Sequence, residues 1–144
     1  MLSQLLLLAA LGGGAALLLF WLRRDRRYES SDSVAAAYDA WTDDRLLERL
    51  WGDHVHLGHY GDPPRSVDFR QAKEAFVHEL VRWSGLDQLP PGSRVLDVGC
   101  GIGGSARILA RDYGLDVLGV SISPAQVQRA TDLTPEGLSC RFQV

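Results

Sequence analysis

The chain has 144 residues, of which 46% are hydrophobic and 23% are charged, a composition typical of a folded domain rather than a disordered segment. The formal net charge of -3 leaves no basic surface, which argues against a nucleic-acid partner. Cys100 and Cys140 lie far apart in dissimilar contexts, so they indicate no disulfide framework and fit a reducing compartment.

The N-terminal segment, residues 1–22, is predicted to be a transmembrane anchor. No residue from Leu2 to Leu22 is charged, and ten of these twenty-one residues are leucine. As a helix, this run would be roughly 30 Å long, which matches the hydrocarbon core of a bilayer. Arginines are concentrated in residues 23–27, so the positive-inside rule predicts that the following domain lies on the cytoplasmic side. The alternatives are a buried core helix and a cleaved signal peptide, and the latter would carry its positive charges before the apolar run and a small-residue cleavage site after it.

Residues 23–33 are polar and are predicted to be a linker, which leads into a helical cap region over residues 34–92. In the cap region apolar residues recur at helical spacing, whereas residues 52–66, rich in glycine, histidine and proline, are predicted to be a loop. The clearest helix is amphipathic, and its apolar positions are Phe69, Ala72, Phe76, Leu80 and Trp83.

The remaining residues, 93–144, show the alternation of strands and helices that is typical of an α/β domain. The expected elements are a strand over 94–98, a helix over 104–113, a strand over 117–120, a helix from Pro124 and a strand from Leu138. Gly114 is placed to end the first helix, and Ser123 is placed to cap the second. This order is the opening of a Rossmann-like, doubly wound sheet, and a complete sheet of that kind needs several more strands. We therefore expect the chain to hold the first half of such a domain.

A glycine-rich loop, Gly99-Cys100-Gly101-Ile102-Gly103-Gly104, joins the first strand to its helix. Such a loop lets a ligand approach the backbone closely, and the helix N-terminus offers free N–H groups. The spacing also satisfies the G-x-G-x-x-G pattern of dinucleotide sites, so a dinucleotide is the alternative ligand. Asp97, two residues before the first glycine, favours a cationic ligand such as S-adenosylmethionine, because a carboxylate would repel a pyrophosphate.

The end of the second strand lacks the acidic residue that usually binds ribose hydroxyls in such folds. Ser121 and Gln126 have neutral hydrogen-bonding side chains that can replace it, and Ile122 can pack on the adenosine. The alternative is that this segment only caps a helix, with Gln126 in solvent.

Three of the four histidines, His54, His56 and His59, lie in the predicted loop. Histidines at this spacing can ligate zinc, but no cysteine is nearby, and we expect no metal site. The other interpretation is that these histidines cover a bound ligand or pack against the neighbouring tryptophans.

Several segments together resemble one group of methyltransferases. They are Ser31–Val34 with Tyr38-Asp39, the run Trp51–Pro64, the run Val95–Gly104, and Ser121–Gln126, in this order. The glycine loop resembles that of class I S-adenosylmethionine-dependent methyltransferases in general. The run Trp51–Pro64 is more specific and resembles the 2-methyl-6-phytyl-1,4-benzoquinol methyltransferase family, a close relative of the tocopherol methyltransferases. Sterol methyltransferases and cyclopropane synthases are similar at a greater distance.

The resemblance implies a class I methyltransferase fold and S-adenosylmethionine as the cofactor. The residues that it implies for cofactor binding are Tyr38, Asp97, Gly99, Cys100, Gly101, Gly103, Ser121, Ile122 and Gln126. It also implies methylation of a ring carbon on a prenylated quinol. A general base would assist this reaction, and the local candidates are His56 and His59. An enzyme for such a lipophilic substrate would work at a plasma or thylakoid membrane, which fits the predicted anchor. Two other functions fit the same residues, namely methylation of a different lipid-like acceptor and cofactor binding without catalysis.

Overall fold

The computed structural model describes residues 30–144, so the predicted anchor and most of the predicted linker lie outside the described residues. In chain order, the elements are α2 (Ser31–Asp43), α3 (Leu46–Trp51), α4 (Phe69–Ser84), the 3₁₀ helix η1 (Leu86–Gln88), β1 (Arg94–Val98), α5 (Gly104–Tyr113), β2 (Asp116–Val120), α6 (Pro124–Asp132) and β3 (Cys140–Gln143). Within residues 30–144, no helix is both long enough and apolar enough to cross a bilayer.

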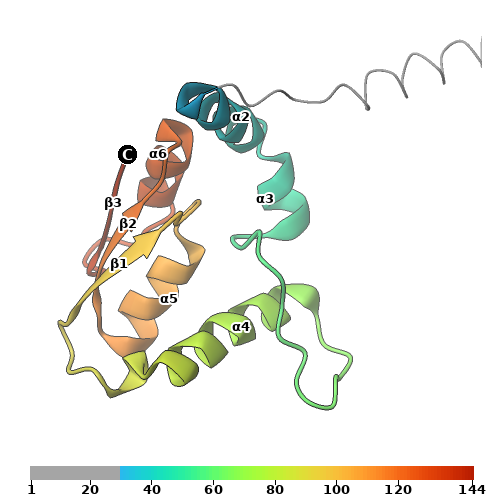
Figure 1. Cartoon of the computed structure of the whole chain (residues 1–144), viewed down its shortest axis with the longest axis vertical. Helices are drawn as coiled ribbons and strands as arrows, with labels where there is room; N and C mark the ends of the chain where they lie inside the picture. Colours follow the sequence, from blue (N-terminus) through green and yellow to red (C-terminus); the bar gives the residue numbers. More distant parts are fainter. Residues whose placement is uncertain (1–29) are drawn as a thin grey trace, which may run out of the picture.

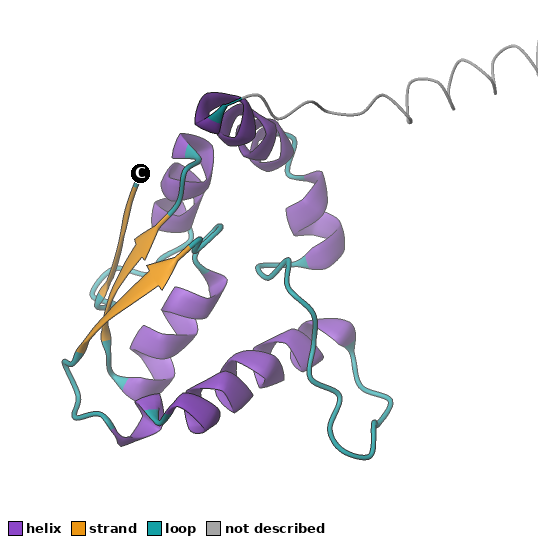
Figure 2. Ribbon diagram, in the orientation of Figure 1, coloured by secondary structure: helices purple, strands orange, loops and turns teal. Residues whose placement is uncertain are grey.

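The three strands form one parallel sheet in the order β1-β2-β3 (Figure 2). Asp97 is paired with Gly119, and Val117 with Cys140, so the carboxyl ends of the strands meet at one edge. Crossovers between parallel strands are right-handed. Because the crossovers β1-α5-β2 and β2-α6-β3 both advance in the same direction across the sheet, α5 and α6 lie on the same face. The predicted α/β fold with a parallel sheet is thereby confirmed. Within residues 30–144 the strand order runs in one direction, without the reversal that makes a sheet doubly wound.

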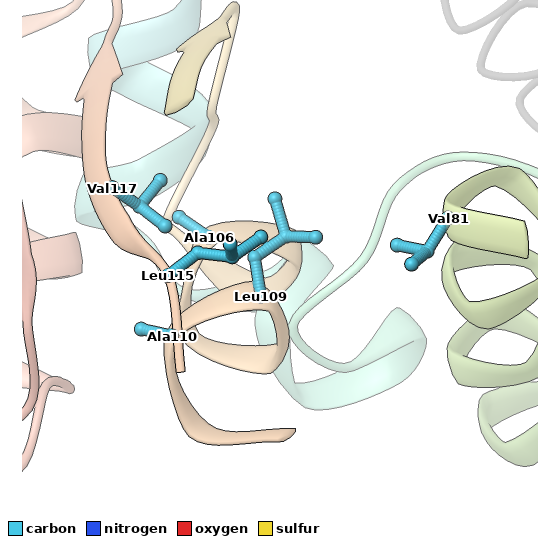
Figure 3. Packing of buried hydrophobic residues seen from close by; sticks show 6 residues of the cluster. All are labelled: Val81, Ala106, Leu109, Ala110, Leu115 and Val117. Atoms are coloured by element: carbon cyan, nitrogen blue, oxygen red, sulfur yellow. The ribbon is translucent and has the colours of Figure 1, made fainter. Parts of the chain in front are cut away.

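The hydrophobic core lies between the covered face of the sheet and the helices α4 and α5 (Figure 3). Its buried members are Val81, Ala106, Leu109, Ala110, Leu115 and Val117. Leu115 and Val117 are 0% exposed, so the start of β2 is the most deeply buried part of the sheet. This packing holds β2 in place, and Ser121 directly follows the carboxyl end of that strand.

The opposite face of the sheet is open among the described residues. Side chains alternate between the two faces of a strand, so along β1 Leu96 and Val98 point away from Val95 and Asp97. Leu96 is 59% exposed and Val98 is 75% exposed, whereas Val95 packs against the core. The same alternation places Asp97 on the covered side.

Two element boundaries differ from the prediction by two residues or more. α2 begins at Ser31 rather than at Val34, because Ser30 Oγ accepts a hydrogen bond from the Ser33 N–H and Ser33 Oγ accepts one from the Ser30 N–H. β3 begins at Cys140 rather than at Leu138, because residues 135–138 form a turn. The helix ends predicted at Gly114 and Ser123 are confirmed.

Helices α2, α3 and α4 run in an arc beside the α/β unit, with α2 against α6 and α4 against α5 (Figure 1). Asp39 of α2 accepts hydrogen bonds at the N-terminus of α6, from Ser123 Oγ and from the Ala125 N–H at 3.0 Å. A carboxylate is favourable there because the helix dipole is positive at its N-terminus. In α3, Glu48 Oε2 accepts from Arg129 Nε of α6 at 2.8 Å. These contacts hold α2 and α3 beside the edge at which the strands end.

Candidate functional site

A cavity of about 520 Å³ opens where β1 and β2 end, between the glycine loop and the helices α2 and α3. Nine of the eleven residues that the sequence predicts for the site line this cavity: Tyr38, His56, Asp97, Gly99, Cys100, Gly101, Ser121, Ile122 and Gln126. Gly103 and His59 do not line it. The structure therefore brings most of the predicted site together from four separate segments.

Asp97 places a carboxylate in the wall of this cavity. Its Oδ2 atom is buried and has no hydrogen-bond partner among residues 30–144. Burial raises the pKa of the Asp97 carboxyl above its ordinary value, and the nearby His56 opposes this rise. Since a buried carboxylate oxygen without a partner is unfavourable, the site suits a ligand that brings a positive charge or a hydrogen-bond donor.

The glycine loop leaves open space beside its backbone. Gly99 and Gly101 have φ angles of 78° and 56°, in the left-handed region that favours glycine. A Cβ atom on either residue would meet no atom within 4 Å, so no other part of residues 30–144 fills this space. The loop leads into the N-terminus of α5, where the first N–H groups have no partner within the helix.

Gly103 has a packing role instead of a place in the cavity wall. A Cβ atom there would lie 2.5 Å from the Phe142 ring and 3.0 Å from Arg107 Nη1. A glycine is required at this position because β3 and a buried arginine approach the loop from behind. The sequence pattern does not distinguish a glycine that admits a ligand from one that admits a neighbouring side chain.

Ser121 and Gln126 contact each other at the end of β2. Ser121 Oγ donates to Gln126 Oε1 at 2.8 Å and accepts from the Ser123 N–H at 3.2 Å. Ser123 caps α6 through the Gln126 N–H, so the capping interpretation holds for Ser123, while the Gln126 side chain bonds to Ser121. Ile122 is 44% exposed and offers apolar surface beside this pair.

Residues 51–59, which we call the histidine segment, lie against the first turn of α5. A Cβ atom on Gly104 would come within 2.6 Å of Asp53 O and 2.8 Å of the His54 ring, so the contact requires a glycine. His56 lines the cavity, and its ring lies 5.4 Å from the Phe76 ring of α4, centroid to centroid. Helices α4 and α5 therefore support the segment from behind.

The second predicted general base, His59, lies elsewhere. It lines another cavity, with His78 and Arg82 among its neighbours, and its N–H donates to Ala72 O at 2.7 Å. Of the two histidines predicted for catalysis, His56 alone shares the cavity with Asp97.

Lys73 of α4 fixes the histidine segment, a role that the sequence analysis missed. The residue is 4% exposed, and its Nζ donates to Trp51 O at 3.1 Å and to His54 O at 2.7 Å. Burial lowers the pKa of the Lys73 ammonium. No local pattern marked this role, because the apolar positions predicted for this helix do not include Lys73, whereas they do include Trp83, which is 85% exposed in the structure.

Arg107 of α5 connects the histidine segment to the glycine loop. It is 8% exposed, and it donates to Asp53 Oδ2 at 2.6 Å and to Ile102 O at 2.7 Å. One guanidinium therefore links the two segments directly. This contact was also not expected from the sequence.

Tyr38 and Cys100 complete the cavity wall. Tyr38 is 39% exposed, and its ring stands edge-on to Trp41 with the centroids 5.4 Å apart. Burial, reinforced by the charge of Asp97, raises the pKa of the Cys100 thiol to about 11. The thiol is therefore protonated near neutral pH and is unsuited to act as a nucleophile.

The comparisons with known proteins agree with this geometry. A family model for mycolic acid cyclopropane synthetases matches residues 64–141, just over half of the chain. A mycolic acid cyclopropane synthase complexed with SAH and CTAB has a similar structure, with a TM-score of 0.62 and 26% identity over 83% of this chain and 41% of that one.

Two curated relatives are similar in sequence. Over 119 residues the chain is 65% identical to 2-methyl-6-phytyl-1,4-hydroquinone methyltransferase of Synechocystis sp., which corresponds to 83% of this chain and 37% of the relative. Over 96 residues it is 41% identical to the chloroplastic tocopherol O-methyltransferase of Arabidopsis thaliana, at 61% and 27% coverage. The chain thus spans about a third of the length of these relatives. On the family match and the shared fold, the chain belongs to the mycolic acid cyclopropane synthetase family and has the class I S-adenosylmethionine-dependent methyltransferase fold.

Proposed function

We propose that this chain is the cofactor-binding part of an S-adenosylmethionine-dependent methyltransferase. The observation that carries the proposal is the buried, partnerless Oδ2 of Asp97 beside the open space of the glycine loop. S-adenosylmethionine carries a positive ammonium and a positive sulfonium group, whereas a dinucleotide would bring a pyrophosphate to the same carboxylate. The residues present therefore fit the first ligand and not the second.

The residues of the cavity suggest a division of roles. Asp97 accepts hydrogen bonds from the amino group, and the N–H groups at the start of α5 bind the carboxylate of the methionine part. Ser121 and Gln126 bind the ribose hydroxyls, and Ile122 packs on the adenosine. The bound cofactor supplies an electrophilic methyl group on its sulfonium. Tyr38 and the histidine segment cover the cavity and keep water from the methyl group.

We further propose that the methyl acceptor is a prenylated hydroquinone. The support is the substrate class in the names of the two curated relatives. A base that removes the proton of a ring hydroxyl raises the electron density of the neighbouring ring carbon, which then attacks the methyl group. Two histidines, His54 and His56, line the cavity and are candidates for this step.

The cofactor is tested by calorimetric titration of the chain with S-adenosylmethionine and with NAD. We expect binding of the first alone, and a loss of about 10- to 100-fold in affinity for Asp97→Asn, which corresponds to one charged hydrogen bond. Asp116→Asn, at the opposite end of the sheet, is the matched control, because Asp116 bonds to Arg141 and lies outside the cavity. Binding of NAD alone, or an unchanged affinity in Asp97→Asn, would contradict the proposal.

The acceptor is tested by methyl transfer to a phytylated hydroquinone, with the mass of the product as the readout. The chain is compared with a longer protein that includes it and matches the full length of the relatives. Transfer by the longer protein supports the proposed acceptor, and a product of another mass identifies a different one. Cofactor binding without any transfer by either protein would favour a binding function alone.

We also propose that residues 2–22 anchor the protein in a plasma or thylakoid membrane, with the described residues on the cytoplasmic side. The support is the uncharged, leucine-rich sequence and the arginines that follow it. Flotation with lipid vesicles should recover the full chain and lose a variant that lacks residues 2–22. Equal flotation of the two proteins would contradict the proposed anchor.

A further inference from the structure

His54 and His56 form a hydrogen-bonded pair whose protons can be assigned from their partners. His56 Nδ1 lies 2.8 Å from Leu57 O, and His56 Nε2 lies 3.1 Å from His54 Nδ1. A carbonyl oxygen only accepts, so His56 Nδ1 carries a hydrogen and donates it to Leu57 O. In a neutral His56 the other nitrogen, Nε2, must then accept, which places the hydrogen between the rings on His54 Nδ1.

This assignment determines which ring nitrogen can accept a further proton. Both nitrogens of His56 are occupied, one as a donor and one as an acceptor. In a neutral pair His54 Nε2 has the free lone pair, and it has no hydrogen-bond partner among residues 30–144. His54 is 8% exposed and lines the cavity together with Asp97. The accepting atom therefore belongs to His54, a residue that the sequence analysis did not assign.

We propose that His54 and His56 act as a proton relay, in which His54 Nε2 accepts the proton of the acceptor hydroxyl and the positive charge comes to rest on His56. The inference rests on the proposed function. The hydroxyl O–H bond breaks and leaves its electron pair on oxygen, while an N–H bond forms at His54 Nε2. In the same transfer the hydrogen on His54 Nδ1 passes to His56 Nε2. The products are an oxyanion, a neutral His54 and a cationic His56, so one proton has moved and the charges balance.

The charged groups around the pair favour the charge on His56. His54 faces Lys73 of α4 and Arg107 of α5, and its neighbour Asp53 offsets these cations only in part. Burial first, and the charge of His56 second, lower the pKa of His54 to about 4. His56, in contrast, faces the carboxylate of Asp97 on β1. The surrounding charges therefore disfavour a cationic His54, so the positive charge of the relay is placed on His56.

The relay is tested by the ring-nitrogen NMR signals of the full 144-residue chain, titrated from about pH 8 to about pH 5. We expect both histidines to carry their hydrogen on Nδ1 at the upper pH. As the pair takes up one proton, both nitrogens of His56 become protonated and His54 changes from the Nδ1–H to the Nε2–H tautomer. A histidine with a merely structural role would show no such exchange of tautomers.

Substitutions give a second readout on the same samples. His56→Gln retains an acceptor for His54 Nδ1 and should abolish the tautomer exchange. His78→Gln, which removes a histidine bonded to Tyr113 outside the cavity, should leave it unchanged. A His54 that keeps its tautomer, or that becomes a cation before His56, overturns the relay.

Titration with S-adenosylmethionine separates the relay from the proposed function. Cofactor binding without tautomer exchange overturns the relay and leaves the function standing. Tautomer exchange in a chain that does not bind the cofactor overturns the role of the pair in methyl transfer.

Discussion

The glycine loop and the histidine segment border the same cavity, but they are built in opposite ways. The loop acts through its backbone, with Gly99, Gly101 and Gly103 at positive φ and open space beside the first two. The histidine segment is held by buried cations from two other elements, Lys73 and Arg107. A site made from backbone is therefore sensitive to changes within it, whereas a segment held by distant side chains is sensitive to changes far from it in the sequence.

A lower pH should affect the histidine segment and not the glycine loop, because the segment contains a group that titrates in the acid range and the loop contains none. The pKa of His54 is lowered from 6.5 to about 4, so between these values the unfolded chain binds a proton that the folded chain does not. The free energy of unfolding should therefore fall as the pH falls through this window, by about 3 kcal/mol in total. Urea denaturation at a series of pH values measures this, and His54→Gln should flatten the dependence. The same pH dependence in both proteins would show that His54 is not the cause.

A substitution within the glycine loop should weaken ligand binding, because the loop binds through its backbone. Gly101→Val adds a branched side chain at positive φ in the space left for the ligand, and we expect S-adenosylmethionine binding to weaken about 100-fold, or about 2.8 kcal/mol. Gly85→Val is the matched control, since Gly85 also has positive φ and no atom within 4 Å of a Cβ, but ends α4 away from the cavity. Both variants should lose stability, and equal affinities in calorimetry would count against the cofactor site.

A substitution in α4, outside the histidine segment, should destabilise that segment. Lys73→Met leaves Trp51 O and His54 O without their buried donor, and we expect the free energy of unfolding to fall by about 2 kcal/mol. Arg70→Met on the same helix is the control, because Arg70 also donates to backbone carbonyls but is exposed, and it should cost less than about 0.5 kcal/mol. Similar losses in the two variants, measured by urea denaturation, would refute the role of Lys73.

A fourth test concerns the carboxylate between the two regions, and its expected effect is the smallest. The pKa of Asp97 is raised by burial, so its ionised form lowers stability once the pH rises through that pKa. Asp97→Asn should therefore raise the melting temperature of the ligand-free chain near neutral pH, while it weakens cofactor binding. A lower melting temperature would mean that the carboxylate stabilises the fold by itself.

The same contrast explains what the sequence could predict. The glycine loop, the Ser123 cap and the end of α5 at Gly114 are backbone conformations with local signatures, and all three are found in the structure. The roles of Lys73 and Arg107 depend on partners 19 and 54 residues away, which no local pattern marks. The role of Gly103 could not be predicted either. Its position fits the glycine pattern of a ligand-binding loop, but the structure requires a glycine there because the Phe142 ring lies too close for a side chain.

The open face of the sheet has a practical consequence for work with this chain. Leu96 and Val98 are exposed on β1, which is also an edge strand of the sheet formed by residues 30–144. Apolar side chains beside unpaired backbone groups invite copies of a chain to stack or to extend one another's sheets. We therefore expect self-association to rise with protein concentration, and a charged side chain at position 98 to be the simplest way to keep the chain monomeric in solution.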